Sequence, residues 1–310
     1  MTDLSWAQRV TDRFFGDRKS PSQKQCDDVA RSISSASTVS SVESPGSMSY
    51  TVICSGCPGP QQDLVLSFRE QGAMLDVDIV KLAKEIHGNL VPESTFHGNM
   101  EGADPPLFIY SMPYLRGSSY TGVQPFWVEL DSNVESTQRA FVKDLARLAE
   151  ESPPVLSKSI LSKLIEALPS IFAKDYPQVL THNDFSVTNI LVNEDTLKVT
   201  GIVDWSLASV MPFGLDLDIL FLATGFRTLH GWHDYGCKQQ LQDVFWDEFW
   251  FSSGIEGEDL RHKTQNLAEV AGQIGAILRL AFRRNDDGSP SEEVLVSGHR
   301  IRQLKVWLGE

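Results

Sequence analysis

The chain has 310 residues, of which 41% are hydrophobic and 22% are charged, and its formal net charge is −14 at pH 7. These values are typical of a globular protein with one or two packed domains and exclude collagen-like, coiled-coil and largely disordered chains. The negative charge argues against a nucleic-acid binder, which needs a basic face, and is compatible with a cationic small-molecule partner.

The N-terminal stretch "MTDLSWAQRV" has no basic segment followed by an apolar run, so it predicts no secretory signal. No apolar run approaches the roughly 20 residues needed to cross a bilayer. We therefore expect a cytoplasmic protein that has no membrane partner.

The first third of the chain predicts two helices and then a small sheet with one internal helix. A serine-rich stretch after the second helix is either a flexible linker or a strand–loop–strand with its turn at 44–47. The expected elements, in order, are helices at 4–15 and 22–34, strands at 49–54 and 63–68, a helix at 74–88 and a strand at 105–115.

From about residue 134 the pattern is mainly helical. Amphipathic helices are expected at 137–151, 161–175 and 259–284, and two short strands at 189–193 and 198–205 interrupt them. A polar turn at 193–196 joins these strands into a hairpin.

A compact group of polar residues surrounds this hairpin. His182 and Asp184 lie in a loop after a strand-like segment, Asn189 begins the first strand, and Asp204 ends the second. The loop and the hairpin can bring two carboxylates and one amide oxygen to one end of a small sheet. Such oxygen ligands suit Mg²⁺, and a carboxylate beside an attacking hydroxyl can accept its proton. These are the groups that phosphoryl transfer requires.

The stretch "THNDFSVTNILVNEDTLKVTGIVDWSLASVMPFGLDLDIL" resembles the aminoglycoside phosphotransferase and choline kinase group, relatives of the protein kinases. The residues of this motif are most similar to those of the fungal phosphotransferase-family branch. The resemblance implies an α+β, bilobal, protein-kinase-like fold. A small, sheet-containing nucleotide lobe with extra N-terminal helices would occupy residues 1–113, and a larger, mainly helical catalytic and substrate-binding lobe would occupy residues 114–310.

The resemblance also implies roles for the motif residues. Asp184 would be the catalytic base, and Asn189 and Asp204 would be the Mg²⁺ ligands. His182 would support the catalytic loop. Asp218 would be the helix carboxylate that holds this loop, with Asp216 as the alternative.

In the nucleotide lobe, the resemblance places a phosphate-covering loop at "SPGSMSY", with Gly46 and Ser47; the alternative is an ordinary hairpin turn. Arg69 stands near the place of the strand lysine that pairs with the nucleotide phosphates, and an arginine retains the charge. Asp78 is the expected carboxylate partner of Arg69 on the following helix. Asp76 and Glu85 are the alternatives.

The segment "IYSMPYLRGSSY" resembles the hinge between the lobes. Backbone groups of Ser111, Met112 and Tyr114 would then read the adenine edge. The alternative is an edge strand that ends at a proline.

The acceptor pocket would lie in the helical C-terminal lobe. Its acidic and aromatic candidates are Asp234, Asp247 and Trp246, together with Glu248 and Trp250. The alternative interpretation of "WDEFW" is that its aromatic residues form a helix core.

The expected function is therefore ATP- and Mg²⁺-dependent transfer of the γ-phosphoryl group to a hydroxyl of a small-molecule metabolite, with GTP as the alternative donor. Two further hypotheses remain: a kinase-like protein that binds a nucleotide or a partner without catalysis, and a nucleotide-dependent reaction of another kind at the same site. A protein kinase is disfavoured, because nothing between Asp204 and the "PFG" at 212–214 is typical of an activation segment.

Overall fold

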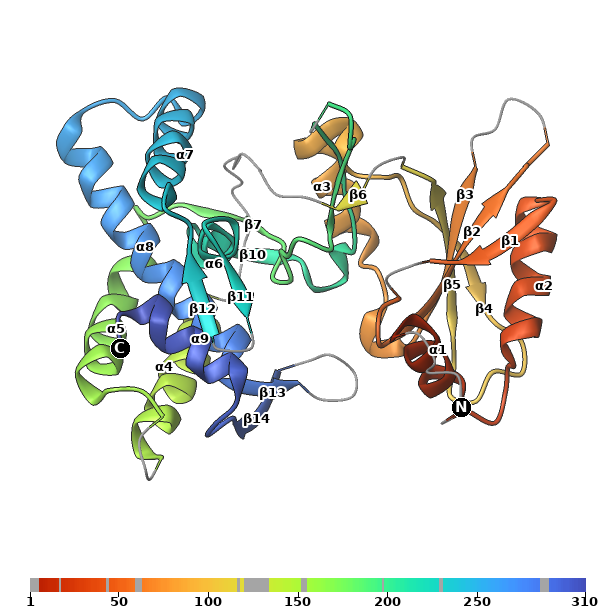
Figure 1. Cartoon of the computed structure of the whole chain (residues 1–310), viewed down its shortest axis with the longest axis horizontal. Helices are drawn as coiled ribbons and strands as arrows, with labels where there is room; N and C mark the ends of the chain where they lie inside the picture. The colour runs from red at the N-terminus through yellow and green to blue at the C-terminus, as the bar shows by residue number, and fades with distance from the viewer. Residues whose placement is uncertain are drawn as a thin grey trace. The chain divides into compact units, whose positions relative to one another are not determined.

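The computed structural model describes residues 6–16, 18–42, 45–58, 63–115, 118–119, 134–151, 155–196, 198–228, 231–284 and 290–310. The chain forms two compact units (Figure 1). Unit 1 consists of residues 1–120, 188–207 and 284–289, and unit 2 consists of residues 121–187, 208–283 and 290–310. The mixed helix and sheet content confirms the predicted α+β class.

Unit 1 is built on a five-stranded antiparallel sheet in the order β1-β2-β3-β5-β4. Its strands are β1 (Thr38–Ser41), β2 (Ser49–Ser55), β3 (Leu64–Arg69), β4 (Thr95–Asn99) and β5 (Phe108–Pro113). Burial alternates along β2, where Tyr50, Val52 and Cys54 point into the core, as the two-residue period of a strand requires. The serine-rich stretch is therefore a strand–loop–strand rather than a linker.

Two helices pack on this sheet, α1 (Trp6–Gly16) and α2 (Gln23–Ser34), as Figure 1 shows beside β1 and β2. A capping box of Ser22 and Gln25 starts α2, which satisfies backbone donors at the helix N-terminus. Cys26 and Ala30 of α2 are fully buried in the core of this unit. The third helix, α3 (Val77–His87), begins after the N-cap Asp76 and ends at Gly88, which has a positive φ, so its predicted end is confirmed.

Strand β4 was not predicted from the sequence. Its five residues are mostly exposed and lack the apolar alternation of a half-buried strand, because β4 forms the edge of the sheet. The alternative interpretation of the hinge segment as an edge strand is wrong, since β5 pairs with β3 on one side and with β4 on the other.

The hairpin after the His-x-Asp motif also belongs to unit 1. Strands β8 (Ile190–Val192) and β9 (Val199–Ile202) form a small antiparallel sheet with β6 (Ser118–Ser119). Strand β9 also contacts the short helix η2 (Gly88–Leu90) that follows α3. These contacts join 188–207 to the N-terminal part of the chain, so the division between units does not follow one boundary after residue 113.

Unit 2 is mainly helical. Its helices are α4 (Val134–Glu150), α5 (Lys158–Ile171), α6 (Asp218–Ala223), α7 (Lys238–Ser253), α8 (Glu258–Leu280) and α9 (His299–Leu308). Its short strands pair as β7 (Gln178–Thr181) with β10 (Ser209–Pro212), β11 (Gly225–Thr228) with β12 (Gly231–Asp234), and β13 (Phe282–Arg284) with β14 (Pro290–Val294). The helix expected at 259–284 ends at Leu280, because the chain then enters β13.

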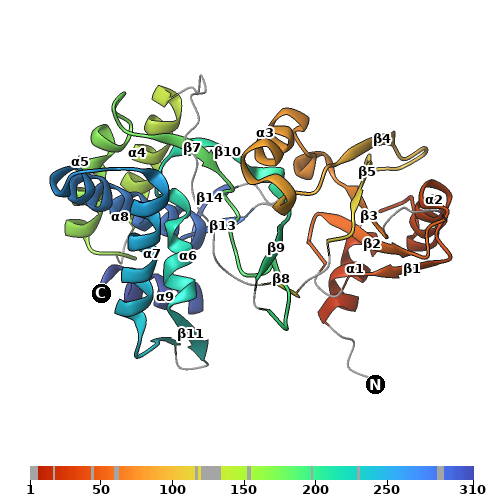
Figure 2. The same cartoon turned by 90° about the horizontal axis from the view of Figure 1, so that it is seen from above.

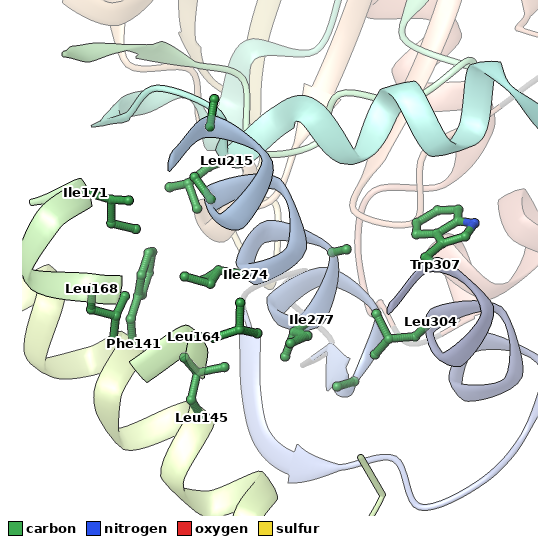
Figure 3. Packing of buried hydrophobic residues seen from close by; sticks show 14 of the residues in the cluster. Phe141, Leu145, Leu164, Leu168, Ile171, Leu215, Ile274, Ile277, Leu304 and Trp307 are labelled. Atoms are coloured by element: carbon green, nitrogen blue, oxygen red, sulfur yellow. The ribbon is translucent and has the colours of Figure 1, made fainter. Parts of the chain in front are cut away.

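The core of unit 2 lies around α8. In Figure 3, Leu164 and Leu168 of α5 face Ile274 and Ile277 of α8, and Figure 2 shows these two helices next to each other. Truncation of such a buried aliphatic side chain to alanine typically costs about 2–5 kcal/mol. Gly275 allows α8 to approach the chain closely, since a Cβ there would lie 1.9 Å from the carbonyl oxygen of Leu215. Among the described residues, no helix is both long and apolar enough to cross a membrane.

Candidate active site

In unit 1, the β8–β9 hairpin positions Asn189 and Asp204 at its open end. Asn189 immediately precedes β8, and its backbone carbonyl accepts a hydrogen bond of 2.9 Å from the N–H of Val203. Asp204 follows shortly after β9 and has a left-handed backbone with φ of 64°. A positive φ is costly for a residue other than glycine and is often found where a side chain is held for function.

The residues after Asp204 hold it in place. The hydroxyl of Ser206 donates to Asp204 Oδ1 over 3.0 Å. Trp205 is buried, its indole N–H donates to the carbonyl of Ile202 over 3.0 Å, and its ring centroid lies 5.2 Å from that of His87. Trp205 is thus a packed aromatic residue, and its packing orients the carboxylate that precedes it.

Asp204 is paired with Arg69, the last residue of β3. Arg69 Nη1 lies 3.0 Å from Asp204 Oδ1 and also donates to the carbonyl of Ala73 over 3.3 Å. The Arg69 side chain is only 8% exposed, and its Nε has no hydrogen-bond partner within the described parts of the chain. The buried guanidinium therefore supplies a fixed positive charge beside a half-exposed carboxylate.

The carboxylates near and on α3 that were expected to pair with Arg69 do not form an ion pair with it in the described structure. Asp76 caps α3 by accepting from the backbone N–H groups of Asp78 and Ile79, and both Asp78 and Glu85 are exposed on α3. In the described regions, the carboxylate within ion-pair distance of Arg69 is Asp204. Sequence analysis missed this pair because its members are 135 positions apart.

The predicted phosphate loop precedes β2 of the five-stranded sheet, and the predicted hinge lies at the end of β5. Gly46 and Ser47 are exposed in the connection before β2. In β5, the pairing with β4 ends at Ser111, whereas the pairing with β3 continues through Met112 and Pro113. The backbone N–H of Tyr114 donates to the carbonyl of Asp63 over 2.8 Å. The end of β5 therefore has one partner strand in the described structure.

In unit 2, the loop that carries His182 and Asp184 follows β7. Asp216 Oδ2 accepts the backbone N–H groups of His182 at 2.7 Å and Asn183 at 3.3 Å. The side-chain amide of Asn183 donates to the Ser209 hydroxyl over 2.7 Å, and Asn183 itself has a positive φ of 61°. His182 is buried, with its ring centroid 5.6 Å from that of Phe185, and its supporting role stays a prediction.

A buried arginine, Arg279 of α8, completes the support of this loop. Its Nη1 donates to the carbonyl of Phe185 over 3.0 Å, and its Nη2 donates to Asp216 Oδ1 over 3.2 Å. Its Nε lies 2.9 Å from Asp218 Oδ2. Sequence analysis did not identify Arg279; the available signal was a charged residue within the apolar run "GAILRLAF".

These contacts give Asp216 and Asp218 different roles. Asp216 accepts hydrogen bonds from the loop backbone, so the carboxylate that contacts the loop is Asp216, the alternative candidate. The expectation that Asp218 makes this contact does not fit the structure. Asp218 is 0% exposed and lies against Arg279. Burial raises the pKa of Asp218 to about 7 against the opposing effect of Arg279, and Asp216 adds to the rise.

The candidates for acceptor binding lie on or near α7. Asp234 is paired with Lys238 at 2.9 Å and accepts from the indole N–H of Trp232, and Asp247 is exposed. Trp246 is 7% exposed and stacks on Trp250 within the core of unit 2. The position of Trp246 favours the interpretation of "WDEFW" as core.

The donor set at the hairpin fits Mg²⁺. Asn189 and Asp204 offer an amide and a carboxylate oxygen, and Mg²⁺ is usually held by one or two protein oxygens together with phosphates and water. No group of three or more histidine, cysteine or acidic residues that could form an all-protein metal site occurs among the residues with described positions.

Residues 121–243 match the model of the phosphotransferase enzyme family. No curated protein matches the chain. Among solved structures, the chain is similar to a putative aminoglycoside phosphotransferase from Ralstonia eutropha JMP134, with 14% identity, a TM-score of 0.52, and coverage of 84% of this chain and 86% of that one. This likeness shows the fold.

Two further structures have TM-scores just below 0.5. The macrolide 2'-phosphotransferase MphH from Brachybacterium faecium is 16% identical, with a TM-score of 0.48 and coverage of 83% of this chain and 91% of that one. An ethanolamine kinase from Plasmodium vivax is 11% identical, with a TM-score of 0.49 and coverage of 89% and 87%. No comparison bears on the fungal branch, which stays a prediction. The predicted resemblance to aminoglycoside phosphotransferases is confirmed by the match over residues 121–243, and the chain has the fold of the Ralstonia structure.

Proposed function

We propose that the chain is a small-molecule kinase that transfers the γ-phosphoryl group of ATP, with Mg²⁺, to a hydroxyl of its acceptor. The observation that carries this proposal is the ion pair between Arg69 and Asp204. In this pair, the proposed phosphate-binding cation lies directly beside the proposed metal-binding carboxylate, near the ends of two strands of unit 1. Phosphoryl transfer consists mainly of such positioning and charge neutralisation.

Within unit 1, each group has a defined task in this proposal. Asn189 and Asp204 would hold Mg²⁺, which neutralises negative charge on the nucleotide phosphates. Arg69 would neutralise phosphate charge through the guanidinium that lies beside Asp204. The backbone at Ser111, Met112 and Tyr114 would read the adenine edge, close to the point where the pairing of β5 with β4 ends at Ser111.

Within unit 2, Asp184 would accept the proton of the attacking hydroxyl, or a hydrogen bond from it. Its loop is tied down at both ends: Asp216 binds the backbone at His182 and Asn183, and Arg279 binds the carbonyl of Phe185. A base that is held in a fixed position loses little entropy when the reactive geometry forms. This saving in entropy lowers the activation free energy of the reaction.

The first experiment is isothermal titration of the purified protein with ATP, with and without Mg²⁺. We expect binding that requires Mg²⁺ and that Asp204→Ala abolishes. Asp195→Ala is the matched control, since Asp195 is an exposed aspartate in the turn of the same hairpin. A library of hydroxylated metabolites is then screened for ADP formation, with phosphorylated products identified by mass.

The second candidate is a kinase-like protein that binds a nucleotide without transferring phosphate. The same ion pair supports it, because Asp204 is already engaged by Arg69, and the strand lysine that the resemblance implies is absent. Metal-dependent ATP binding without turnover of any acceptor would favour this candidate. Absence of binding at every Mg²⁺ concentration would contradict both candidates.

A further inference from the structure

A cavity of about 270 Å³ lies in unit 2. It is formed by β11, β12 and the first turns of α9, which lie near one another in Figure 1, and α9 contacts β12. The side chains that line it include Arg227, Thr228, Trp232, His299, Arg302 and Gln303. None of these residues has a role in the function proposed above.

The charge of this cavity is opposite to that of the protein. The chain carries 41 acidic and 27 basic residues, yet Arg227 and Arg302 both line the cavity, and no acidic residue does in the described structure. Neither guanidinium has a carboxylate within ion-pair distance where the chain is described. Desolvation, followed by the positive charges of Arg227, Arg300 and Arg302, lowers the pKa of His299, as expected at a positive potential.

Gln303 supplies an independent observation. It is only 5% exposed, and it lines the cavity from α9. Its side-chain amide makes no hydrogen bond within the described structure and is not among the enclosed polar atoms that lack a partner, so it reaches the open space of the cavity. An amide in this position is suited to a ligand that supplies the missing hydrogen bond.

The start of α9 adds donors of its own. The helix begins at His299 after Gly298, which offers no side-chain cap, and its first intrahelical bond runs from the N–H of Arg302 to the carbonyl of Gly298. The N–H groups of a first helical turn have no acceptor within the helix, and the helix dipole makes this end partially positive. Both properties favour an anion.

We propose that this cavity is a binding site for the oxyanion group, carboxylate or phosphate, of a small molecule. Arg227 and Arg302 would bind the oxyanion through charge-assisted hydrogen bonds, and the amide of Gln303 would donate a further one. Trp232 forms an apolar wall for the rest of the ligand. The proposal does not depend on phosphoryl transfer, because it rests on other residues.

The test is isothermal titration of the full chain with inorganic phosphate and, separately, with acetate, at an ionic strength held constant with chloride and without nucleotide. We expect saturable binding of at least one of them. The tighter probe identifies whether the natural ligand carries a phosphate or a carboxylate. Arg227→Gln and Arg302→Gln should each weaken binding about tenfold or more, and Gln303→Met should weaken it less.

Arg283→Gln is the matched control. It removes the same charge from an exposed site in unit 2, where Arg283 pairs with Glu293, and it should leave binding unchanged. Circular dichroism checks that each variant is folded. In a second readout, phosphate should raise the pKa of His299 in a proton NMR titration, because a nearby anion favours the charged imidazole. The signal is assigned with His299→Gln.

Three results would overturn the proposal. The first is no saturable binding of either probe up to about 10 mM. The second is equal weakening by Arg283→Gln and Arg302→Gln, which would indicate a general effect of charge. The third is phosphate binding that Arg69→Gln abolishes and Arg302→Gln leaves intact, which would place the anion in unit 1. Failure of Mg²⁺-dependent ATP binding would leave this proposal standing.

Discussion

Arg69 and Asp204 form an ion pair with 3.0 Å between Nη1 and Oδ1, although 135 positions separate them in the chain. The pair links the last residue of β3 to the residue that follows the β8–β9 hairpin. Because the guanidinium is buried and the carboxylate is half-exposed, Arg69 is fixed by the fold while the Asp204 carboxylate stays accessible. A metal ion bound at Asp204 would therefore lie beside the guanidinium of Arg69, which the fold already holds in place.

Replacement of Arg69 tests this arrangement. Arg69→Met should lower the affinity for Mg²⁺ and ATP by about 10- to 100-fold, because charge-assisted hydrogen bonds contribute about 1.5–3 kcal/mol. Arg69→Lys should be intermediate, since it keeps the charge and loses the forked donors. Isothermal titration with ATP and Mg²⁺ measures both. An unchanged affinity in a folded Arg69→Met protein would show that this arginine does not meet the nucleotide.

Asp184→Asn separates chemistry from binding. The amide has nearly the same shape but cannot accept the hydroxyl proton, so kcat should fall by about two to four orders of magnitude. The affinity for Mg²⁺ and ATP should change little, because Asn189 and Asp204 are intact. Turnover close to that of the wild type would remove Asp184 from the role of base. The assay uses an acceptor found in the metabolite screen.

Asp216 should act on catalysis through the loop that it holds. Asp216→Ala leaves two backbone N–H groups without their acceptor and Arg279 without one carboxylate, which costs about 1–3 kcal/mol for each buried group left unsatisfied. We expect a lower melting temperature and a reduced kcat, with ATP binding retained. Asp216→Asn, which preserves an acceptor oxygen, should recover part of both. Asp243→Asn, at an exposed position of α7, is the control. A kcat unaffected by Asp216→Ala would contradict the positioning role.

Asp218 should make stability depend on pH. Its pKa is 3.8 in a solvated reference and about 7 in the folded protein, so the folded carboxyl holds a proton between these values that the unfolded chain has released. The stability contributed by this proton is fully present below the unfolded pKa and is lost as pH rises through the folded pKa. The slope is at most about 1.4 kcal/mol per pH unit.

Urea unfolding of the wild type and Asp218→Asn at about pH 5 and about pH 8 measures this effect. The advantage of the asparagine variant over the wild type should grow with pH, because its amide never ionises. A difference that is constant, or that reverses in favour of the wild type, would show that Arg279 keeps Asp218 ionised throughout this range.

Several features could be predicted from the sequence because local chemistry decides them. The spacing of His182, Asp184, Asn189 and Asp204, followed by a hairpin pattern, indicated the phosphotransferase resemblance that the family match and the fold confirm. The end of α3 at Gly88 and the start of α2 at Ser22 follow from residues that satisfy helix termini. Each of these signals lies within one or two turns of the element that it determines.

Only the tertiary structure could choose between Asp216 and Asp218 as the carboxylate that binds the loop. Residues two apart on a helical segment point in different directions, so one of them meets the backbone of His182 while the other meets Arg279. The direction of each depends on how α6 and α8 pack, and nothing near these residues in the chain specifies that packing.

The same reason explains the pairing of Arg69. The sequence by itself determined that a cation ends β3 and that a carboxylate follows β9, since both are set by strand patterns. It could not determine that they meet, because several carboxylates, Glu70 first, lie far closer to Arg69 in the chain. A contact across 135 positions depends on how the sheet and the hairpin assemble. The local sequence therefore determines which functional groups are present at these two places, and the long-range packing determines which of them come into contact.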